Sequence, residues 1–263
     1  MQSPARVSTV GHLLQQWRQV RRLSQLALAS DARVSPRHLS FVESGRSAPS
    51  RDMIITLAAA LDVPLRDRNQ LLLAGGYAPI YHETPLADPA MAAVHDALHR
   101  VLRHHQPYPA VVLDRHWNVL ATNEPAAAMF AFLLAGVSAP EPPNVVRLIF
   151  GPLRPYVRNF DDVGPSLVQR VHREAVCGAV DPQTETLLRE VLALPGIPTA
   201  WRRPDLTARL TPTVPVNFAR DGVSVSYFSL VTTVGTPQDV TAQELRLESF
   251  FPLDPATERH RWH

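Results

Sequence analysis

The sequence contains one cysteine, no lysine and no long apolar run. Cys177 alone excludes an internal disulfide and a zinc site built on several thiolates, and it suits a reducing compartment. No apolar stretch approaches the roughly 20 residues that a membrane helix needs. Residues 1–6 lack the basic region and apolar stretch of a secretory signal. We therefore expect a cytoplasmic protein without membrane association.

Charge and proline are distributed unevenly along the 263 residues. All 26 basic residues are arginine. Residues 1–75 carry ten arginines and five acidic residues, for a net charge of +5, whereas the remainder has a net charge of −3. Only four of the 25 prolines lie in the first 75 residues. The two parts are therefore built differently, and the basic first part suggests contact with a polyanion such as DNA.

Apolar residues at helical spacing mark five short helices before residue 76, the first of them from Val10. Serine, proline and glycine residues predict where these helices begin and end. The expected starts are Ser24, Ser35-Pro36 and Pro49-Ser50, and the expected stops are Glu43-Ser44-Gly45 and Gly75-Gly76. Residues 1–76 are therefore predicted to form an all-α domain of five helices.

Two of these helices carry a specific spacing. Residues 25–46 read QLALASDARVSPRHLSFVESGR. Ala29 is small enough for close helix packing, and Leu39 and Val42 can anchor the second helix while its other side faces outward. The segment resembles the helix-turn-helix of the Cro/C1-type (XRE) regulators, over about residues 10–75. The resemblance implies that the second helix enters the major groove of double-stranded operator DNA.

By this resemblance, nine residues are expected to contact DNA: Gln25, Ser35, Pro36, Arg37, His38, Ser40, Phe41, Arg46 and Ser47. Arg37 is the best base reader, because a guanidinium binds guanine O6 and N7 bidentately. Phe41 can touch a thymine methyl group, while Arg46 and Ser47 fit phosphate contacts. The alternative is a helical bundle that binds protein, but the motif and the basic charge favour DNA.

The resemblance also implies two structural features. Arg18 in the first helix is expected to pair with Glu43 at the end of the third. The family usually has glycine where this chain has Arg33. A non-glycine residue at positive φ costs about 1–2 kcal/mol, so we expect strain in this turn.

The remainder is predicted to mix sheet and helix. Residues 77–105 are expected to form a linker and a connecting helix, Met91–His105, with a hinge at Gly75–Pro89. The expected strands are Ala110–Leu113, Trp117–Ala121, Thr213–Phe218, Val223–Val234 and Glu244–Phe251, with a hairpin turn at Asp221-Gly222. A helix from Asn123 to about Leu134 and a mostly helical stretch over 144–194 complete an α+β fold, an antiparallel sheet covered by helices over 106–263.

The stretch WNVLATNEPAAAMF at residues 117–130 reads as a hairpin, an asparagine and a small-residue helix, and IPTAWRRPDL follows at 197–206. Behind a helix-turn-helix, this order resembles the MmyB-like ligand-binding domain, over about residues 95–235. The resemblance implies a PAS-like sheet that encloses an apolar cavity for a fatty-acid-like or other lipophilic small molecule, and dimerisation through this domain. Residues 244–263 depart from the usual family ending, so no ligand contact is carried over there.

Ten residues are the expected ligand contacts: Trp117, Asn123, Met129, Phe130, Leu133, Leu148, Phe150, Arg154, Tyr156 and Tyr227. Core packing is the simpler role for any single apolar member. Asn123, Arg147, Arg154 and Arg158 are the candidates to hold a polar head group, because arginine is the natural partner of a carboxylate or phosphate. For each of these four residues, a solvated position on the surface is the simpler role.

No catalytic constellation is recognisable, since the sequence lacks GxSxG, GxGxxG and Walker A motifs. His95 and His99 lie four residues apart but lack a third metal ligand at suitable spacing. His172 and Cys177, five residues apart, do not share a helix face. We therefore expect no enzyme activity, no metal and no cofactor.

The sequence predicts a homodimeric transcription regulator that senses a small lipophilic ligand, since one short recognition helix covers too few bases for genomic specificity. One alternative is a DNA-binding dimer whose PAS-like domain serves only as an oligomerisation or partner platform. The other is a small-molecule carrier or enzyme with a helical accessory module.

Overall fold

The computed structural model describes residues 10–139, 141–176, 181–202 and 213–262, without the side chains of 173–176. The described chain forms two compact units. The helical unit runs to Glu83 and includes Gln238–Gln243, and the sheet unit comprises the other described residues. Arg203–Leu206 of the expected 197–206 motif, Cys177 and residues 1–6 lie outside the described residues.

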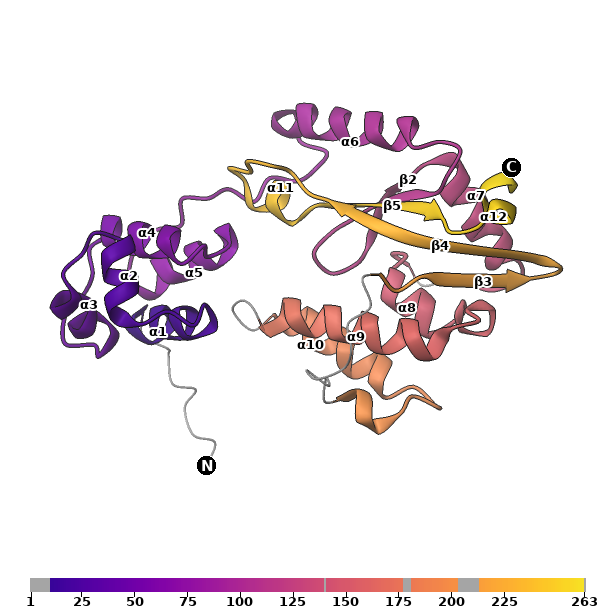
Figure 1. The fold of residues 1–263 in the computed structure, drawn as a ribbon. Helices are drawn as coiled ribbons and strands as arrows, with labels where there is room; N and C mark the ends of the chain where they lie inside the picture. The colour runs from indigo at the N-terminus through magenta and orange to yellow at the C-terminus, as the bar shows by residue number, and fades with distance from the viewer. Residues whose placement is uncertain (1–9, 140, 177–180, 203–212, 263) are drawn as a thin grey trace. The chain divides into compact units, whose positions relative to one another are not determined.

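The helical unit confirms the predicted all-α domain. Its five N-terminal helices are α1 (Val10–Val20), α2 (Gln25–Asp31), α3 (Pro36–Glu43), α4 (Arg51–Ala60) and α5 (Leu65–Ala74) (Figure 1). Ser24 and Ser50 cap α2 and α4 as predicted, accepting hydrogen bonds from Ala27 N and Met53 N at 3.0 and 3.2 Å. Ser35 occupies the N-cap position of α3, but its side chain makes no capping bond to a described residue. Its hydroxyl is therefore not committed to the helix.

A glycine sets the distance between α1 and α3. A Cβ atom built on Gly11 would lie 2.1 Å from the backbone oxygen of Val42. Any other residue at position 11 would force the two helices apart. The C-terminal end of α3 is therefore held directly against the backbone of α1.

The expected hinge over Gly75–Pro89 is partly fixed in place. Asn69 of α5 accepts hydrogen bonds from Ile80 N and Tyr81 N at 3.1 Å each, and it donates to Tyr81 O at 2.7 Å. The chain therefore stays with the helical unit as far as Glu83, whereas we expected the unit to end at residue 76.

The sheet unit contains the predicted antiparallel sheet. Its strands are β1 (Ala110–Leu113), β2 (Val119–Thr122), β3 (Val216–Arg220), β4 (Val223–Thr232) and β5 (Arg246–Pro252), in the order β2-β1-β5-β4-β3. The hairpin turn at Asp221-Gly222 is confirmed, with φ values of 46° and 81° that fit a type I′ turn. Trp117, expected in the second strand, instead lies in the turn before β2 at a φ of 69°.

Helices lie on both sides of this sheet (Figure 1). The sheet unit contains α6 (Ala92–His104), α7 (Glu124–Leu133), α8 (Val145–Phe150), α9 (Phe160–Val176), α10 (Pro182–Leu192) and α12 (Pro255–Arg259), while α11 (Val240–Glu244) lies in the β4–β5 connection. Figure 1 shows α6 along one face, and α8, α9 and α10 gathered at the other. The α+β fold class is thus confirmed, and no helix of the described residues is long and apolar enough to span a membrane.

Candidate DNA interface and ligand cavity

Helix α3 has one buried and one exposed side. Leu39 and Val42 are 0 % and 1 % exposed and pack in the core of the helical unit. Ser35, Pro36 and Arg37 are exposed at its N-terminal end. His38, Ser40 and Phe41 are half-buried, and the Arg37 guanidinium lies 5.5 Å from the centre of the Phe41 ring. The expected base-reading side chains are therefore brought together on one outward side.

A buried ion pair fixes this helix. Arg18 Nε and Nη2 donate to the two carboxylate oxygens of Glu43, both at 2.7 Å, which confirms the expected pair. The Glu43 side chain is only 2 % exposed. Burial alone would raise the pKa of Glu43, but hydrogen bonds from Arg18 and Gln25 and the Arg18 charge lower it instead. Both carboxylate oxygens are thus committed to holding α3 in place.

Gln25 belongs to the same cluster. Its Nε2 donates to Glu43 Oε2 at 2.8 Å, so its side chain is oriented by the ion pair at the start of α2. Arg46 and Ser47 follow α3, and their backbone nitrogens donate to Phe41 O at 2.8 and 3.2 Å. The exposed Arg46 side chain is therefore presented from a fixed turn, beside the outward side of α3.

The turn between α2 and α3 shows the expected departure. Arg33 has a φ of 53°, a conformation that usually requires glycine. Arg33 N nevertheless bonds Ser30 O at 3.1 Å, and Val34 N bonds Ala29 O at 2.9 Å. The turn geometry is kept and the chain tolerates the strain.

The sheet unit contains a cavity of about 130 Å³ that is partly open to solvent. Most of its wall is apolar, and the polar contributors are Ser166, Arg170, Ser229 and Glu248. The apolar wall consists of Val111, Trp117, Met129, Phe130, Val145, Leu148, Ile149, Leu153, Val163, Leu167, Val214, Val216, Phe218, Tyr227 and Phe250. A mostly apolar wall with a few convergent polar groups is typical of a small-molecule site.

The structure places half of the expected ligand contacts in this wall, namely Trp117, Met129, Phe130, Leu148 and Tyr227. Leu133 and Phe150 are core residues, 1 % and 2 % exposed, outside the described lining. Tyr156 packs against the core beneath the Arg220 guanidinium. Arg154 donates to Pro195 O and Gly196 O at 2.7 and 3.0 Å.

The remaining head-group candidates also lie outside the lining. Asn123 is the N-cap of α7 and donates to Leu102 O and Tyr108 O, so its side chain is used in the fold. Arg147 pairs with Glu190 at 2.8 Å, and Arg158 is exposed. The polar lining residues of α9, β4 and β5 were missed. A charged residue in the middle of an apolar strand, as Glu248 is in β5, was the available signal.

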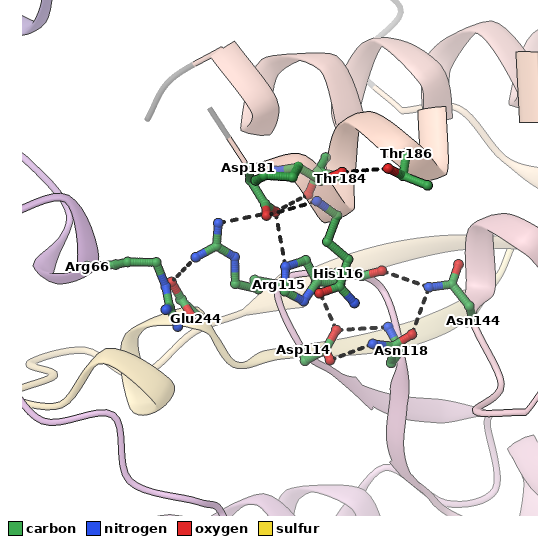
Figure 2. Close-up of polar contacts among 12 residues, drawn as sticks. Arg66, Asp114, Arg115, His116, Asn118, Asn144, Asp181, Thr184, Thr186 and Glu244 are labelled. Atoms are coloured by element: carbon green, nitrogen blue, oxygen red, sulfur yellow. Dashed lines mark hydrogen bonds and ion pairs between the residues drawn. The ribbon is translucent and has the colours of Figure 1, made fainter. Parts of the chain in front are cut away.

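Trp117 closes one side of the cavity from a strained position. It is 1 % exposed, and the guanidinium groups of Arg170 and Arg246 lie 4.5 and 5.2 Å from its ring. Asp114 holds the turn by accepting bonds from the backbone nitrogens of His116 and Asn118 at 2.8 and 2.9 Å (Figure 2). These bonds stabilise the positive φ that directs the ring inward.

A second polar network anchors the same turn. Asp181, which precedes α10, contacts Arg115 at 3.2 Å and His116 at 3.0 Å, and Arg115 also contacts Glu244 at 3.0 Å (Figure 2). Burial would raise the pKa of Asp181, but the hydrogen bond from Thr184 and the charges of Arg115 and His116 lower it. The cavity wall is thereby tied to the start of α10 and to the end of α11.

The other sequence candidates do not form a reactive site in the described part of the chain. His95 Nε2 and His99 Nε2 lie 3.1 Å apart, without a group of three metal-ligating side chains among the described residues. The His172 ring is half-buried, and burial lowers its pKa. Cys177, which we did not expect to share a helix face with His172, lies outside the described residues.

A helix-turn-helix unit followed by a sheet unit with an apolar cavity defines a class, the DNA-binding transcription regulators with a ligand-binding domain. Residues 94–262 match the model of the MmyB-like transcription regulator ligand binding domain, and residues 14–67 match a helix-turn-helix model. The chain belongs to the MmyB-like regulator family, as the sequence resemblance implied.

Other comparisons add little. No curated protein matches the chain. A solved structure entitled "Structure of an RNA-binding Light-Oxygen-Voltage Receptor" is 14 % identical over 93 % of this chain, with a TM-score of 0.26. This chain covers 58 % of that one, or a little over half its length. A likeness at this level carries no argument about function.

Proposed function

We propose that this regulator binds operator DNA as a homodimer through the outward side of α3, and that a small lipophilic molecule in the cavity of the sheet unit modulates that binding. The observation that carries the proposal is the two-sided α3. Its inner side and its Glu43 are locked into the core, so Arg37 is presented on a rigid element. A preorganised base-reading side chain is what direct readout needs.

The DNA interface is tested by arginine substitutions. Arg37→Ala should weaken binding to the operator by about 10- to 100-fold, with less effect on unrelated DNA. Arg46→Ala should weaken binding to all sequences and reduce the salt dependence by about one phosphate contact. Mobility-shift titrations at several salt concentrations, with DNA from upstream of the gene, measure both. The matched control is Arg100→Ala on α6, and intact operator affinity in Arg37→Ala would overturn the proposed register.

The expected second copy has a candidate surface in the sheet unit. Leu230 is 53 % exposed on β4, next to Ser229, which lines the cavity. Because side chains alternate along a strand, Leu230 points to the opposite face, along which α6 runs with Val101 43 % exposed. These apolar side chains suit an isologous contact between two copies. Leu230→Asp with Val101→Asp should yield a monomer by light scattering, whereas an unchanged mass would exclude this face.

The connection from β4 to β5 is a route for ligand control. Ser229 and Glu248 in these strands line the cavity, while Gln238–Gln243 between the strands belongs to the helical unit. Gln243 Oε1 accepts a hydrogen bond from Leu65 N at 2.7 Å and so caps α5, whose N-cap residue Pro64 offers no side-chain acceptor. A ligand that favours one arrangement of these strands can thereby bias the helical unit.

Substitution of Gln243 tests whether this connection couples ligand binding to operator binding. Gln243→Ala should retain operator binding and ligand binding but lose the effect of ligand on operator affinity. The matched control is Gln238→Ala, which changes an exposed residue of the same segment. If ligand still shifts operator affinity in Gln243→Ala as in the wild type, the signal takes another path.

A further inference from the structure

The polar end of the cavity contains an incompletely satisfied buried carboxylate. The Glu248 side chain is 9 % exposed and lines the cavity from the central strand β5. Ser229 Oγ donates to Glu248 Oε1 at 2.5 Å, and Arg170 Nη1 lies 3.4 Å from the same oxygen. Among the described residues, no hydrogen bond reaches Oε2. One acceptor of this cavity-lining residue is thus available to a hydrogen-bond donor.

The guanidinium of Arg170 at this end of the cavity limits which ligand charges fit. Arg170 is the one cation among the described lining residues, and its one ion pair with a described residue is the 3.4 Å contact with Glu248. Arg246 also contacts the Trp117 ring but is outside the lining. A ligand carboxylate would compete with Glu248 for Arg170 and be repelled by the Glu248 charge. A ligand ammonium would likewise compete with Arg170 for Glu248 and be repelled by the Arg170 charge.

We propose that Glu248 and Arg170 select an uncharged head group that both donates and accepts hydrogen bonds, such as a hydroxyl or a primary amide, on a compact apolar body. The head group donates to Glu248 Oε2 and accepts from Arg170, so the Arg170–Glu248 contact is kept. This inference rests on the proposed ligand-binding function, and it names the class of molecule that the cavity takes.

The cavity volume limits the apolar body. At about 130 Å³ the cavity is close to the roughly 150 Å³ of an engineered cavity that binds benzene. Short alkyl chains and single rings fill such a space, and a longer chain extends out of its open side.

The test uses four molecules that share an eight-carbon chain, namely octanol, octanamide, octanoate and octylamine, titrated calorimetrically into the full chain at neutral pH. Octanol and octanamide should bind at least about tenfold more tightly than the two charged compounds. In Glu248→Gln, octanoate should gain about tenfold, because the repulsion is removed and Arg170 is free to pair. In Arg170→Gln, octylamine should gain instead. Glu258→Gln, which changes an exposed glutamate of α12, is the matched control and should change nothing.

The outcomes separate this inference from the function on which it rests. Tightest binding by octanoate, unchanged in Glu248→Gln, would overturn the head-group selection and leave the lipophilic site standing. Tightest binding by octylamine would do the same. Absence of binding by all four compounds, with the wild type and both variants folded by circular dichroism, would overturn the lipophilic site itself.

Discussion

Two buried glutamates, one in each unit, show how differently the two regions are built. Glu43 in the helical unit and Glu248 in the sheet unit are both buried. Glu43 uses both carboxylate oxygens, with three hydrogen bonds from Arg18 and Gln25 at 2.7 to 2.8 Å. Among the described residues, Glu248 accepts only at Oε1, from Ser229 at 2.5 Å and from Arg170 at 3.4 Å.

The difference in hydrogen bonding indicates that Glu43 has a structural role, whereas Glu248 is able to bind a ligand. A buried carboxylate whose oxygens are all satisfied by neighbours holds those neighbours in place and has nothing to offer a ligand. A cavity-lining carboxylate with one oxygen that accepts no hydrogen bond from its neighbours can still bind a donor on a ligand. The helical unit thus holds α3 in a fixed position, whereas the sheet unit provides a cavity that a ligand can occupy.

The largest expected effect distinguishes the two glutamates by substitution. Glu43→Gln should lower the free energy of unfolding by about 3 kcal/mol, because it leaves the Arg18 cation buried without a counter-charge. Glu248→Gln should change it by less than about 1 kcal/mol, because the amide oxygen still accepts from Ser229 and Arg170 is partly solvated. Hydrogen exchange followed by mass spectrometry reports the loss separately for peptides of each unit. Equal destabilisation by the two substitutions would remove the distinction.

A second comparison concerns packing. Gly11→Ala should destabilise the helical unit by about 2 kcal/mol, because the added Cβ would lie 2.1 Å from Val42 O, a backbone atom that cannot move without shifting α3. Val163→Leu also adds carbon, but into the wall of the cavity, and should cost less than about 1 kcal/mol. Denaturant midpoints for the two variants measure the contrast. A tolerated alanine at position 11 would show that α1 and α3 are not in close contact.

The structure of the helical unit could largely be predicted from the sequence, whereas that of the sheet unit could be predicted only in outline. Helical spacing, serine caps and glycine stops predicted α1 to α5 nearly to the residue, since these signals are local. The pairing of Arg18 with Glu43 came from the family resemblance. The strands were predicted with ends shifted by a few residues, and Trp117 was placed in a strand because its positive φ has no sequence signature.

The cavity could be predicted only in part. Apolar residues that line a cavity and those that fill a core have the same composition, so Leu133 and Phe150 were indistinguishable from Met129 and Phe130. Arginines near the expected pocket, Arg154 among them, were favoured over Arg170, whose role depends on how α9 meets the sheet. The inclusion of Gln238–Gln243 in the helical unit is a long-range contact that no local pattern encodes.

Acidic pH should weaken the cluster formed by Arg18, Gln25 and Glu43. The pKa of Glu43 in the folded state is lowered from the ordinary 4.5, so its ion pair contributes fully above that value and is lost as the pH falls through the folded-state pKa. The stability difference between the wild type and Glu43→Gln should therefore shrink between about pH 6 and about pH 3. Thermal melting across this range measures it, with the exposed Glu258→Gln as the control. A constant difference would mean that Glu43 stabilises α3 without its charge.

The smallest expected effect compares two residues at positive φ, Arg33 in the helix-turn-helix and Trp117 beside the cavity, at 53° and 69°. Both positions favour glycine, but only Arg33 is exposed, so replacing it discards no buried contact. Arg33→Gly should relieve the strain and raise the free energy of unfolding by about 1 kcal/mol, after allowance for the extra freedom of glycine in the unfolded chain. Chemical denaturation measures the gain, with Arg33→Ala as the control that removes the side chain but keeps the Cβ. A gain in both variants would assign the effect to charge and not to φ, whereas a loss in Arg33→Gly would show that the helical unit draws stability from the arginine itself.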